Sequence, residues 1–383
     1  MVKKYLLTPG PTPVPAAVAC AQAADMVSHR GREFHELFQY VSTTLRDVVG
    51  TTQEVFLLTG SGTAAMEAAV ANLMSPGEKA LVVRSGHFGN RWADILKEYG
   101  VMVRGIDVEW GRAVNPKLVA ERLAEDGGNE IRAVFTTFVD TSTGVVQDVE
   151  EMGRIVATSN ALLVVDAVSG LGAMDFRMDE WNVDVTLSAS QKSFMTPPGI
   201  AFIALSAKAW KVCERAKCPR YYWDLRKYRQ WGEKFETPYT PAVATLRGLA
   251  KALELMIEEG LPNIFSRHEK LARATRAAVS ALALRLFPLN PANVLTVLRP
   301  PDEIGADELR DHIARIYGVI LAGGQGQLKD RIIRIAHMGA AGPFDVITAV
   351  AALEAGLADK GYVFEPGAGI AAAEEIIKEI SKG

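Results

Sequence analysis

The chain has 383 residues, of which 49% are hydrophobic and 23% charged, and its formal net charge is −3. These values are typical of a globular protein and disfavour nucleic acid or an anionic membrane as the main partner, because both attract basic surfaces. The length corresponds to about two domains. Three cysteines disfavour a disulfide scaffold and indicate a reducing, cytoplasmic location. The sequence shows neither a secretory leader nor an apolar run long enough to span a membrane.

The first 15 residues contain alternate prolines and are expected to be extended rather than helical. Short apolar segments then alternate with helix-like segments over residues 16–260. The expected strands are Val55–Leu58, Ala80–Arg84, Val101–Val108, Ala133–Phe138, Ala161–Asp166, Val183–Leu187 and Ile200–Leu205. Apolar strands separated by helices are typical of a mostly parallel sheet covered on both faces, so we expect one large α/β domain.

Residues 261–383 mix strand-like and helix-like segments without strict alternation, which predicts a smaller α+β domain. Residues 218–241 break the pattern, because aromatic side chains from Tyr221 to Tyr239 are interleaved with basic ones. Such a composition can bind nucleic acid. The overall acidity instead favours a folded loop packed at a domain or subunit boundary.

Gly60-Ser61-Gly62-Thr63 follows an expected strand and opens an expected helix. Free backbone N–H groups and the helix dipole favour an anion at such a place, and the two hydroxyl groups add donors. The alternative is a tight turn in which Ser or Thr only caps the helix. The segment therefore indicates a phosphate site without establishing one.

Asp166 and Lys192 each follow an apolar strand. A carboxylate at the carboxyl end of a strand lies where open α/β sheets bind ligands, although it can also cap the next segment. Lys192 stands in Ser190-Gln191-Lys192, ahead of Pro197-Pro198-Gly199. A lysine beside apolar or cationic groups has a lowered pKa and can form a Schiff base, while a surface loop lysine is the alternative.

Arg334 alternates with Ile333 and Ile335, so period-two counting places it on the strand face of Ile332 and Ala336. A buried arginine requires an anion, either a substrate carboxylate or an internal carboxylate. An anion cradle, a strand-end Asp and a later Lys together suit pyridoxal 5'-phosphate, whose amino-acid substrate needs a cation for its α-carboxylate.

These motifs, with Arg334-Ile335-Ala336-His337-Met338-Gly339, resemble the class V aminotransferases. The alanine/serine–glyoxylate group and its aspartate aminotransferase relatives are the most similar, and the likeness runs from Leu7 to about Gly356. The resemblance implies the type I fold of pyridoxal-phosphate enzymes, with a large mostly parallel domain and a smaller C-terminal one. It also implies a homodimer with shared active sites and no metal.

The resemblance implies that Lys192 binds the cofactor covalently and moves the substrate α-proton, while Asp166 pairs with the pyridine nitrogen. Phe88 would stack on the ring, and Tyr239 and Thr240 would reach the phosphate of the partner subunit. The implied cofactor site is Ser61, Gly62, Thr63, Phe88, Thr141, Asp166, Gln191, Lys192, Tyr239 and Thr240. The implied substrate site is Gly10 and Arg334.

Ala189, Ala336 and Val139-Asp140 depart from the pattern common in the family and leave the shape of the side-chain pocket open. The expected reaction is ping-pong transfer of the amino group of alanine or serine to glyoxylate or pyruvate. The alternative is aspartate as donor with 2-oxoglutarate or another oxo acid as acceptor, which needs a second cation such as Arg30 or Arg32. A desulfurase is disfavoured because no cysteine follows Cys218, and a non-catalytic protein because both Lys192 and Asp166 are present.

Overall fold

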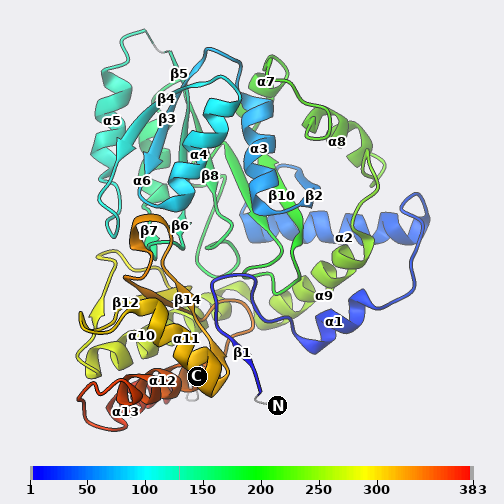
Figure 1. Cartoon of the computed structure of the whole chain (residues 1–383). Coiled ribbons are helices and arrows are strands. Elements are labelled where there is room, and N and C mark those ends of the chain that lie inside the picture. Colours follow the sequence, from blue (N-terminus) through cyan, green and yellow to red (C-terminus); the bar gives the residue numbers. More distant parts are fainter. Residues whose placement is uncertain (1–2, 129, 380–383) are drawn as a thin grey trace.

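The computed structural model describes residues 3–128 and 130–379. Figure 1 shows the chain coloured along the sequence. The helices are α1 (Ala16–Gln22), α2 (Arg32–Val49), α3 (Gly62–Leu73), α4 (His87–Glu98), α5 (Pro116–Ala124), α6 (Val149–Val156), α7 (Ala207–Cys213), α8 (Leu225–Gly232), α9 (Val243–Glu259), α10 (Leu261–Ala281), α11 (Ala306–Tyr317), α12 (Pro343–Asp359) and α13 (Ala368–Ile377), with a 3-10 turn η1 (Gly326–Leu328).

The strands of the first 205 residues are β1 (Tyr5–Leu6), β2 (Val55–Gly60), β3 (Lys79–Arg84), β4 (Met102–Asp107), β5 (Ile131–Thr137), β6 (Val139–Asp140), β7 (Val145–Val146), β8 (Leu162–Asp166), β9 (Val185–Ala189) and β10 (Gly199–Leu205). The later strands are β11 (Arg285–Leu286), β12 (Leu295–Arg299), β13 (Val319–Ile320), β14 (Ala322–Gly323) and β15 (Ile333–Ala336).

A seven-stranded sheet in the order β2-β10-β9-β8-β5-β3-β4 forms the centre of the molecule. Its strands from β9 to β4 pair in parallel, and β10 runs antiparallel to both of its neighbours. The sequence prediction of a mostly parallel sheet is therefore confirmed. The strands β3, β5, β8 and β9 bury apolar side chains on both faces, as parallel sheets require, whereas the edge strand β4 is largely exposed.

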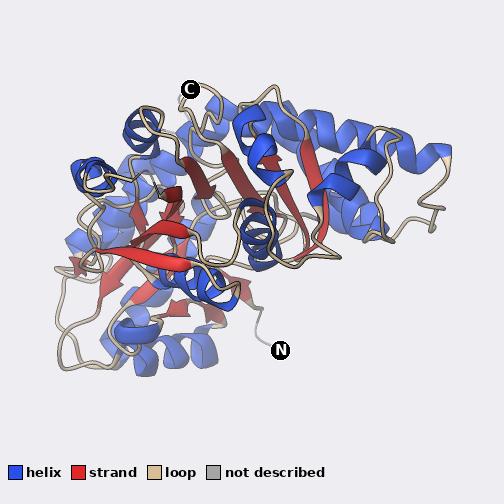
Figure 2. Cartoon of the chain, turned by 90° about the horizontal axis from the view of Figure 1, so that it is seen from above, coloured by secondary structure: helices blue, strands red, loops and turns tan. Residues whose placement is uncertain are grey.

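Helices cover both faces of this sheet (Figure 2). Successive side chains of a strand point to opposite faces, so Leu81 and Val83 enter one core while Ala80 and Val82 enter the other. The first core includes side chains of α2, α6 and α9, and the second includes those of α3, α4 and α7. This sandwich fixes the sheet and leaves the carboxyl ends of its parallel strands as the place for polar chemistry.

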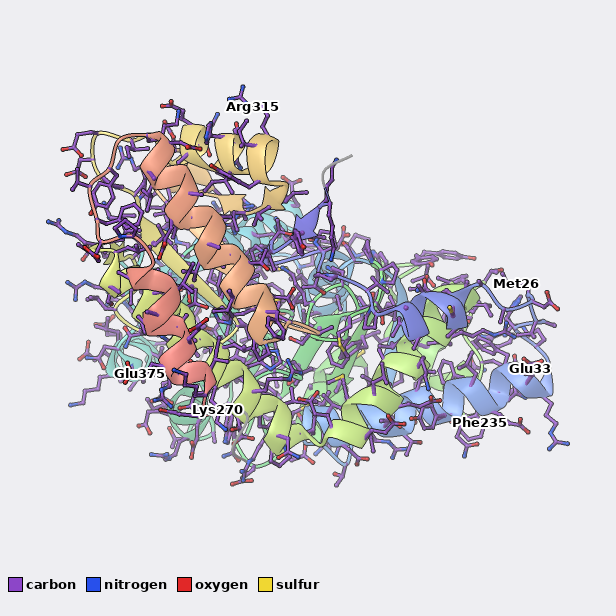
Figure 3. The ribbon with its side chains drawn as sticks, turned by 90° about the horizontal axis from the view of Figure 1, so that it is seen from below. Met26, Glu33, Phe235, Lys270, Arg315 and Glu375 are labelled. Carbon is purple, nitrogen blue, oxygen red and sulfur yellow. The ribbon has the colours of Figure 1, made fainter. Side chains whose placement is uncertain are left out.

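A smaller antiparallel sheet, β11-β12-β15-β14, follows in the C-terminal third. Its Ile333 and Ile335 pack in a third core with residues of α11 and α12, and α10 packs against α13. In Figure 3, Lys270, Arg315 and Glu375 mark this C-terminal part, and Met26, Glu33 and Phe235 lie at the opposite end of the molecule. The N-terminal strand β1 pairs in parallel with β13, so the beginning of the chain lies beside the C-terminal part.

One feature differs from the sequence expectations. The segment 218–241 is not only a loop, because it contains α8, whose side chains Leu225 and Tyr228 are buried in the second core. Asp224 caps this helix by accepting a hydrogen bond from the N–H of Arg226, and a helix as short as this one gives little periodicity to read. The first 15 residues are extended as expected, apart from their short pairing with β13. Among the described residues, no helix is both long and apolar enough to cross a membrane.

Candidate active site

The ends of β2, β8 and β9 bring three polar segments of the sequence to one cavity of about 290 Å³. Gly60-Ser61 ends β2, Asp166 ends β8, and Lys192 follows β9 after two residues. The lining residues are Gly10, Pro11, Ser61, Gly62, Thr63, Met66, Phe88, Arg91, Asp166, Val168, Ser169, Gln191, Lys192 and Pro198. Most of the residues implied by the resemblance therefore surround one space.

Lys192 is only 9% exposed, and burial followed by the charge of Arg334 lowers the pKa of its amine to about 8. Its Nζ donates to the carbonyl oxygen of Pro9, in the N-terminal segment. Thr12 also joins the N-terminal segment to the lysine loop, because its Oγ1 donates to the Lys192 carbonyl oxygen at 2.8 Å. The lysine is thus a buried, partly neutral amine rather than a surface side chain.

Gly10→Ala is expected to displace the Lys192 side chain. Gly10 has φ +117°, which disfavours a side chain, and a Cβ there would lie 2.6 Å from both Cε and Nζ of Lys192. We expect turnover to fall by at least about tenfold, because a small misplacement of a reacting group costs up to about 10²-fold. Steady-state kinetics checks this result, with Gly77→Ala as the control, because Gly77 also has a positive φ but no atom within 4 Å of its Cβ position. Equal losses in both variants would contradict it.

Asp166 is 3% exposed and ends the fully buried strand β8. Its Oδ1 accepts a hydrogen bond from the N–H of Val168 at 2.9 Å. Burial, aided by the nearby carboxylate of Asp140, raises the pKa of this carboxyl to about 6 despite that hydrogen bond. A carboxyl that costs this much to ionise is the kind of group that a buried cationic ligand would stabilise.

The N-terminus of α3 borders the cavity beside these two residues. Ser61 is the N-cap residue, but its side chain makes no capping hydrogen bond. A Cβ on Gly62 would lie 2.8 Å from the side chain of Val168. Glycine therefore allows the backbone at the start of α3 to pack this close to Val168. The buried Oε1 of Gln191 has no hydrogen-bond partner among the described residues. The uncapped helix N-terminus favours an anion site over a mere cap, whereas the Gln191 oxygen is an acceptor that needs a donor.

Asp140 is a buried carboxylate that the motif analysis noted only as a departure from the family pattern. Its Oδ2 accepts from the N–H groups of Phe88 at 3.0 Å and Gly89 at 3.3 Å, at the start of α4. Its Oδ1 accepts from the N–H of Ser142 at 3.0 Å and from its hydroxyl at 2.5 Å. Any side chain on Gly86 would overlap the Asp140 carboxylate. Asp140 thereby fixes the helix end that carries Phe88 into the cavity.

Arg334 is 6% exposed and lies on β15, on the strand face that period-two counting predicted. Its Nε donates to the carbonyl oxygen of Gly323 at 2.7 Å, and Nη1 donates to that of Thr141 at 2.9 Å. Burial lowers the pKa of its guanidinium to about 10. It makes no salt bridge with a described residue and does not line the cavity, although its charge acts on Lys192. Two carbonyls orient it and leave Nη2 for an anion.

The remaining implied residues lie outside the cavity lining. Thr141 is buried, and its backbone oxygen holds Arg334. The Tyr239 ring stacks on that of Tyr222 with centroids 4.8 Å apart, and Thr240 is exposed. Arg30 donates to Glu236 at 2.6 Å and lies over the Trp231 ring. Arg32 pairs with Glu36 at the surface. Neither Arg30 nor Arg32 is therefore placed to bind a substrate in this cavity.

Arg91 is the charged lining residue that sequence reasoning missed. It stands one helical turn after Phe88 on α4, a spacing that places both side chains on one helix face. This i, i+3 relation was the available signal, but it required knowing that a helix begins at His87.

The lining fits pyridoxal 5'-phosphate. Lys192 supplies an amine of lowered pKa, Asp166 supplies a buried carboxyl for a cationic ring nitrogen, and Phe88 supplies an aromatic face. The free N–H groups at the start of α3 border the same space. A phosphate needs such donors, and a helix N-terminus provides them.

Comparison with known proteins agrees with this reading. The family model described as aminotransferase class-V matches residues 5–297. The chain is 41% identical over 98% of both chains to a protein of Synechococcus sp. (strain PCC 6716) named soluble hydrogenase, small subunit. It is 36% identical to the L-aspartate–glyoxylate aminotransferase of Paracoccus denitrificans, over 97% of this chain and 95% of that one. It is 33% identical to the serine–glyoxylate aminotransferase of Methylorubrum extorquens, over 98% and 96%.

The same relationship holds for a solved structure. Ureidoglycine–glyoxylate aminotransferase from Bacillus subtilis superposes with a TM-score of 0.93 at 26% identity, covering 99% of both chains. The expected type I fold is confirmed by this superposition, and the expected cofactor by the family match and the cavity lining together. The chain belongs to the class V aminotransferase family, and it is a transaminase whose cofactor is pyridoxal 5'-phosphate.

Proposed function

We propose that this transaminase moves the amino group of alanine or serine to glyoxylate or pyruvate by a ping-pong mechanism. The observation that carries the proposal is the cavity that joins Lys192 and Asp166, with Arg334 buried beside it. Relatives that differ in amino donor share glyoxylate in their names, which supports this acceptor. Arg334 suits the α-carboxylate of such a donor, and the cavity arginine Arg91 is bound to Thr63.

The residues divide the work as follows. Pyridoxal phosphate supplies, when bound, a carbonyl group that exchanges amino groups and a ring that withdraws electrons from the substrate Cα. Lys192 Nζ would hold the cofactor, and its free amine would accept the substrate α-proton and donate it again. Asp166 would keep the ring nitrogen protonated, and Phe88 would face the ring. Arg334 Nη2 binds the substrate carboxylate and so orients the Cα–H bond.

Aspartate is the alternative donor, with 2-oxoglutarate or another oxo acid as acceptor. The name of the Paracoccus relative supports it. The two arginines suggested for the second carboxylate add no support within one chain, because Arg30 is held by Glu236 and Arg32 pairs with Glu36 at the surface. We retain alanine and serine as the first choice for this reason.

We propose that the enzyme is a homodimer in which Tyr239 and Thr240 reach the phosphate of the partner subunit. Their place outside the cavity of their own chain supports this role. We also propose three segments, an extended 1–15, a large domain 16–260 and a small domain 261–383, because α9 ends at Glu259 and α10 begins at Leu261. Three free cysteines support a cytoplasmic location.

Alanine or serine, added without an oxo acid, is expected to convert the bound cofactor from its aldehyde to its amine form, whereas aspartate is not. The visible absorption spectrum of the purified holoenzyme measures this conversion for each donor separately. Conversion by aspartate alone would overturn the donor proposal and favour the alternative. A protein that shows no cofactor band after addition of pyridoxal phosphate would instead contradict the binding of that cofactor.

A further inference from the structure

Arg91 is a cation on the cavity wall without a charged partner. Among residues 3–128 and 130–379, no carboxylate lies within ion-pair distance of its guanidinium. Its Nη1 donates to Thr63 Oγ1 at 2.9 Å, and Nη2 lies 3.3 Å from His87 Nε2. The guanidinium carbon is 4.7 Å from the centroid of the Phe88 ring. A half-buried guanidinium with two neutral partners retains a full charge that an anion would stabilise.

The hydrogen bond to Thr63 determines how that hydroxyl can act. A threonine hydroxyl has one hydrogen to donate, and here its oxygen already accepts from Arg91. Its own O–H therefore remains free to donate to another group. Thr63 is the second residue of α3, where the first backbone N–H groups have no acceptor within the helix. The hydroxyl and these N–H groups border the same cavity as Arg91.

Arg91 also connects the two helices that build the cavity. It belongs to α4, contacts the ring of Phe88 on its own helix, and reaches across to Thr63 on α3. The two helices pack side by side in front of the sheet in Figure 1. One side chain therefore ties the wall that faces a cofactor ring to the helix end that faces a cofactor phosphate.

We propose that Arg91 completes the phosphate site of this enzyme, by orienting the Thr63 hydroxyl toward the phosphate and by supplying the positive charge that the α3 N-terminus lacks. The phosphate carries between one and two negative charges near neutral pH, and the side chains at the start of α3 are neutral. Arg91 is a positioning residue toward the Thr63 hydroxyl, and it adds its own charge to the same site. The inference rests on the cofactor, and it is independent of the amino donor.

Pyridoxal, which lacks the phosphate, separates this role from any role in holding the ring. Apoprotein is titrated with pyridoxal phosphate and with pyridoxal, and each Kd is read from quenching of tryptophan fluorescence. Arg91→Gln is expected to weaken pyridoxal phosphate about 10- to 100-fold, the range of a hydrogen bond to a charged group, and pyridoxal less than about twofold. Arg91→Lys, which keeps the charge without the fork, is expected to lie between the two.

A double-mutant cycle with Thr63→Val tests the route through the hydroxyl. If Arg91 acts through Thr63, the double variant binds pyridoxal phosphate less weakly than the product of the two single losses predicts. Arg32→Gln is the matched control, because Arg32 is 92% exposed and pairs with Glu36 outside the cavity. Melting of each apoprotein identifies a variant whose loss of binding reflects unfolding.

Two results would overturn the inference. An equal weakening of pyridoxal and pyridoxal phosphate would assign Arg91 to the ring wall alone. Unchanged cofactor affinity with a raised KM only for aspartate would assign it to a substrate carboxylate. If wild-type apoprotein binds neither compound, the cofactor assignment fails rather than the role of Arg91, so the two failures are distinguishable.

Discussion

Replacing Lys192 with alanine is expected to abolish covalent binding of the cofactor and to lower turnover by about 10⁴-fold. Loss of a positioned proton-transfer group alone costs on the order of 10²–10⁴-fold, and this variant also loses the amine that binds the carbonyl. Reduction with borohydride before mass spectrometry measures covalent binding directly. Lys251→Ala is the control, because that lysine pairs with Glu254 on the surface of α9. If Lys192→Ala retained the mass of the bound cofactor as the wild type does, another lysine would be the site of covalent binding.

The pH dependence of covalent binding follows from the environment of the same amine. Only neutral amine attacks a carbonyl, and burial with the charge of Arg334 lowers the Lys192 pKa from 10.5 to about 8. The rate of cofactor attachment to apoprotein is therefore expected to rise through about pH 8 and then level off. Stopped-flow absorbance measures this rate. A rate that still climbs tenfold per pH unit between pH 9 and 10 would show an unperturbed lysine.

Asp166→Asn is expected to make the apoprotein more stable at pH 8 and the holoenzyme much less active. The carboxyl has a pKa of about 6 in the fold against 3.8 ordinarily, because it is buried. A raised carboxyl pKa means that folding favours the protonated form. The free energy of unfolding therefore falls as the pH rises from about 4 to about 6, and it stays lower above pH 6. The shift corresponds to about 3 kcal/mol above pH 6 and to nothing below about pH 4. The amide avoids this cost, and its expected gain is therefore confined to the higher pH.

The catalytic loss in the same variant has a different origin. An amide cannot hold the ring nitrogen in its protonated form, so turnover is expected to fall on the order of 10²–10³-fold, as when other preorganised electrostatic groups are removed. Urea unfolding of the apoprotein at pH 4 and pH 8, with turnover measured at pH 8, gives both quantities. Asp184→Asn is the matched control, because Asp184 is also buried but accepts hydrogen bonds from the Leu163 N–H and Ser206 Oγ. It is expected to lose stability. Destabilisation of Asp166→Asn at pH 8 would contradict the argument.

The parts of the site that the sequence predicted are those recorded in short stretches of the chain. Asp166 directly ends an apolar strand, Ser61 to Thr63 open a helix, and Lys192 follows a strand by two residues, so local reading placed them all at one sheet edge. Arg334 could be predicted because it is a charged residue within an otherwise apolar strand. The sheet was predictable for the same reason, since most of its strands are apolar runs.

The parts that were missed depend on contacts between distant residues. Asp140 binds the N–H of Phe88, 52 positions earlier, and Arg91 binds Thr63, 28 positions earlier. No local pattern records either pairing. The helix α8 was missed in the aromatic segment 218–241 for another reason. Only Leu225 and Tyr228 are buried in this helix, and the many exposed basic side chains around them hide its apolar face in the sequence. Composition therefore indicated a loop where tertiary packing stabilises a helix.

Because β1 pairs with β13, the active site can be completed only late in the synthesis of the chain. Pro9 and Gly10 lie against Lys192, and the strand just before them is held at Tyr5 by Val319. Tyr5 cannot pair with Val319 until more than 300 further residues have been synthesised. Contacts of such long sequence separation form slowly. The large sheet can form during synthesis, whereas the segment over the catalytic lysine cannot settle until the C-terminal part has emerged.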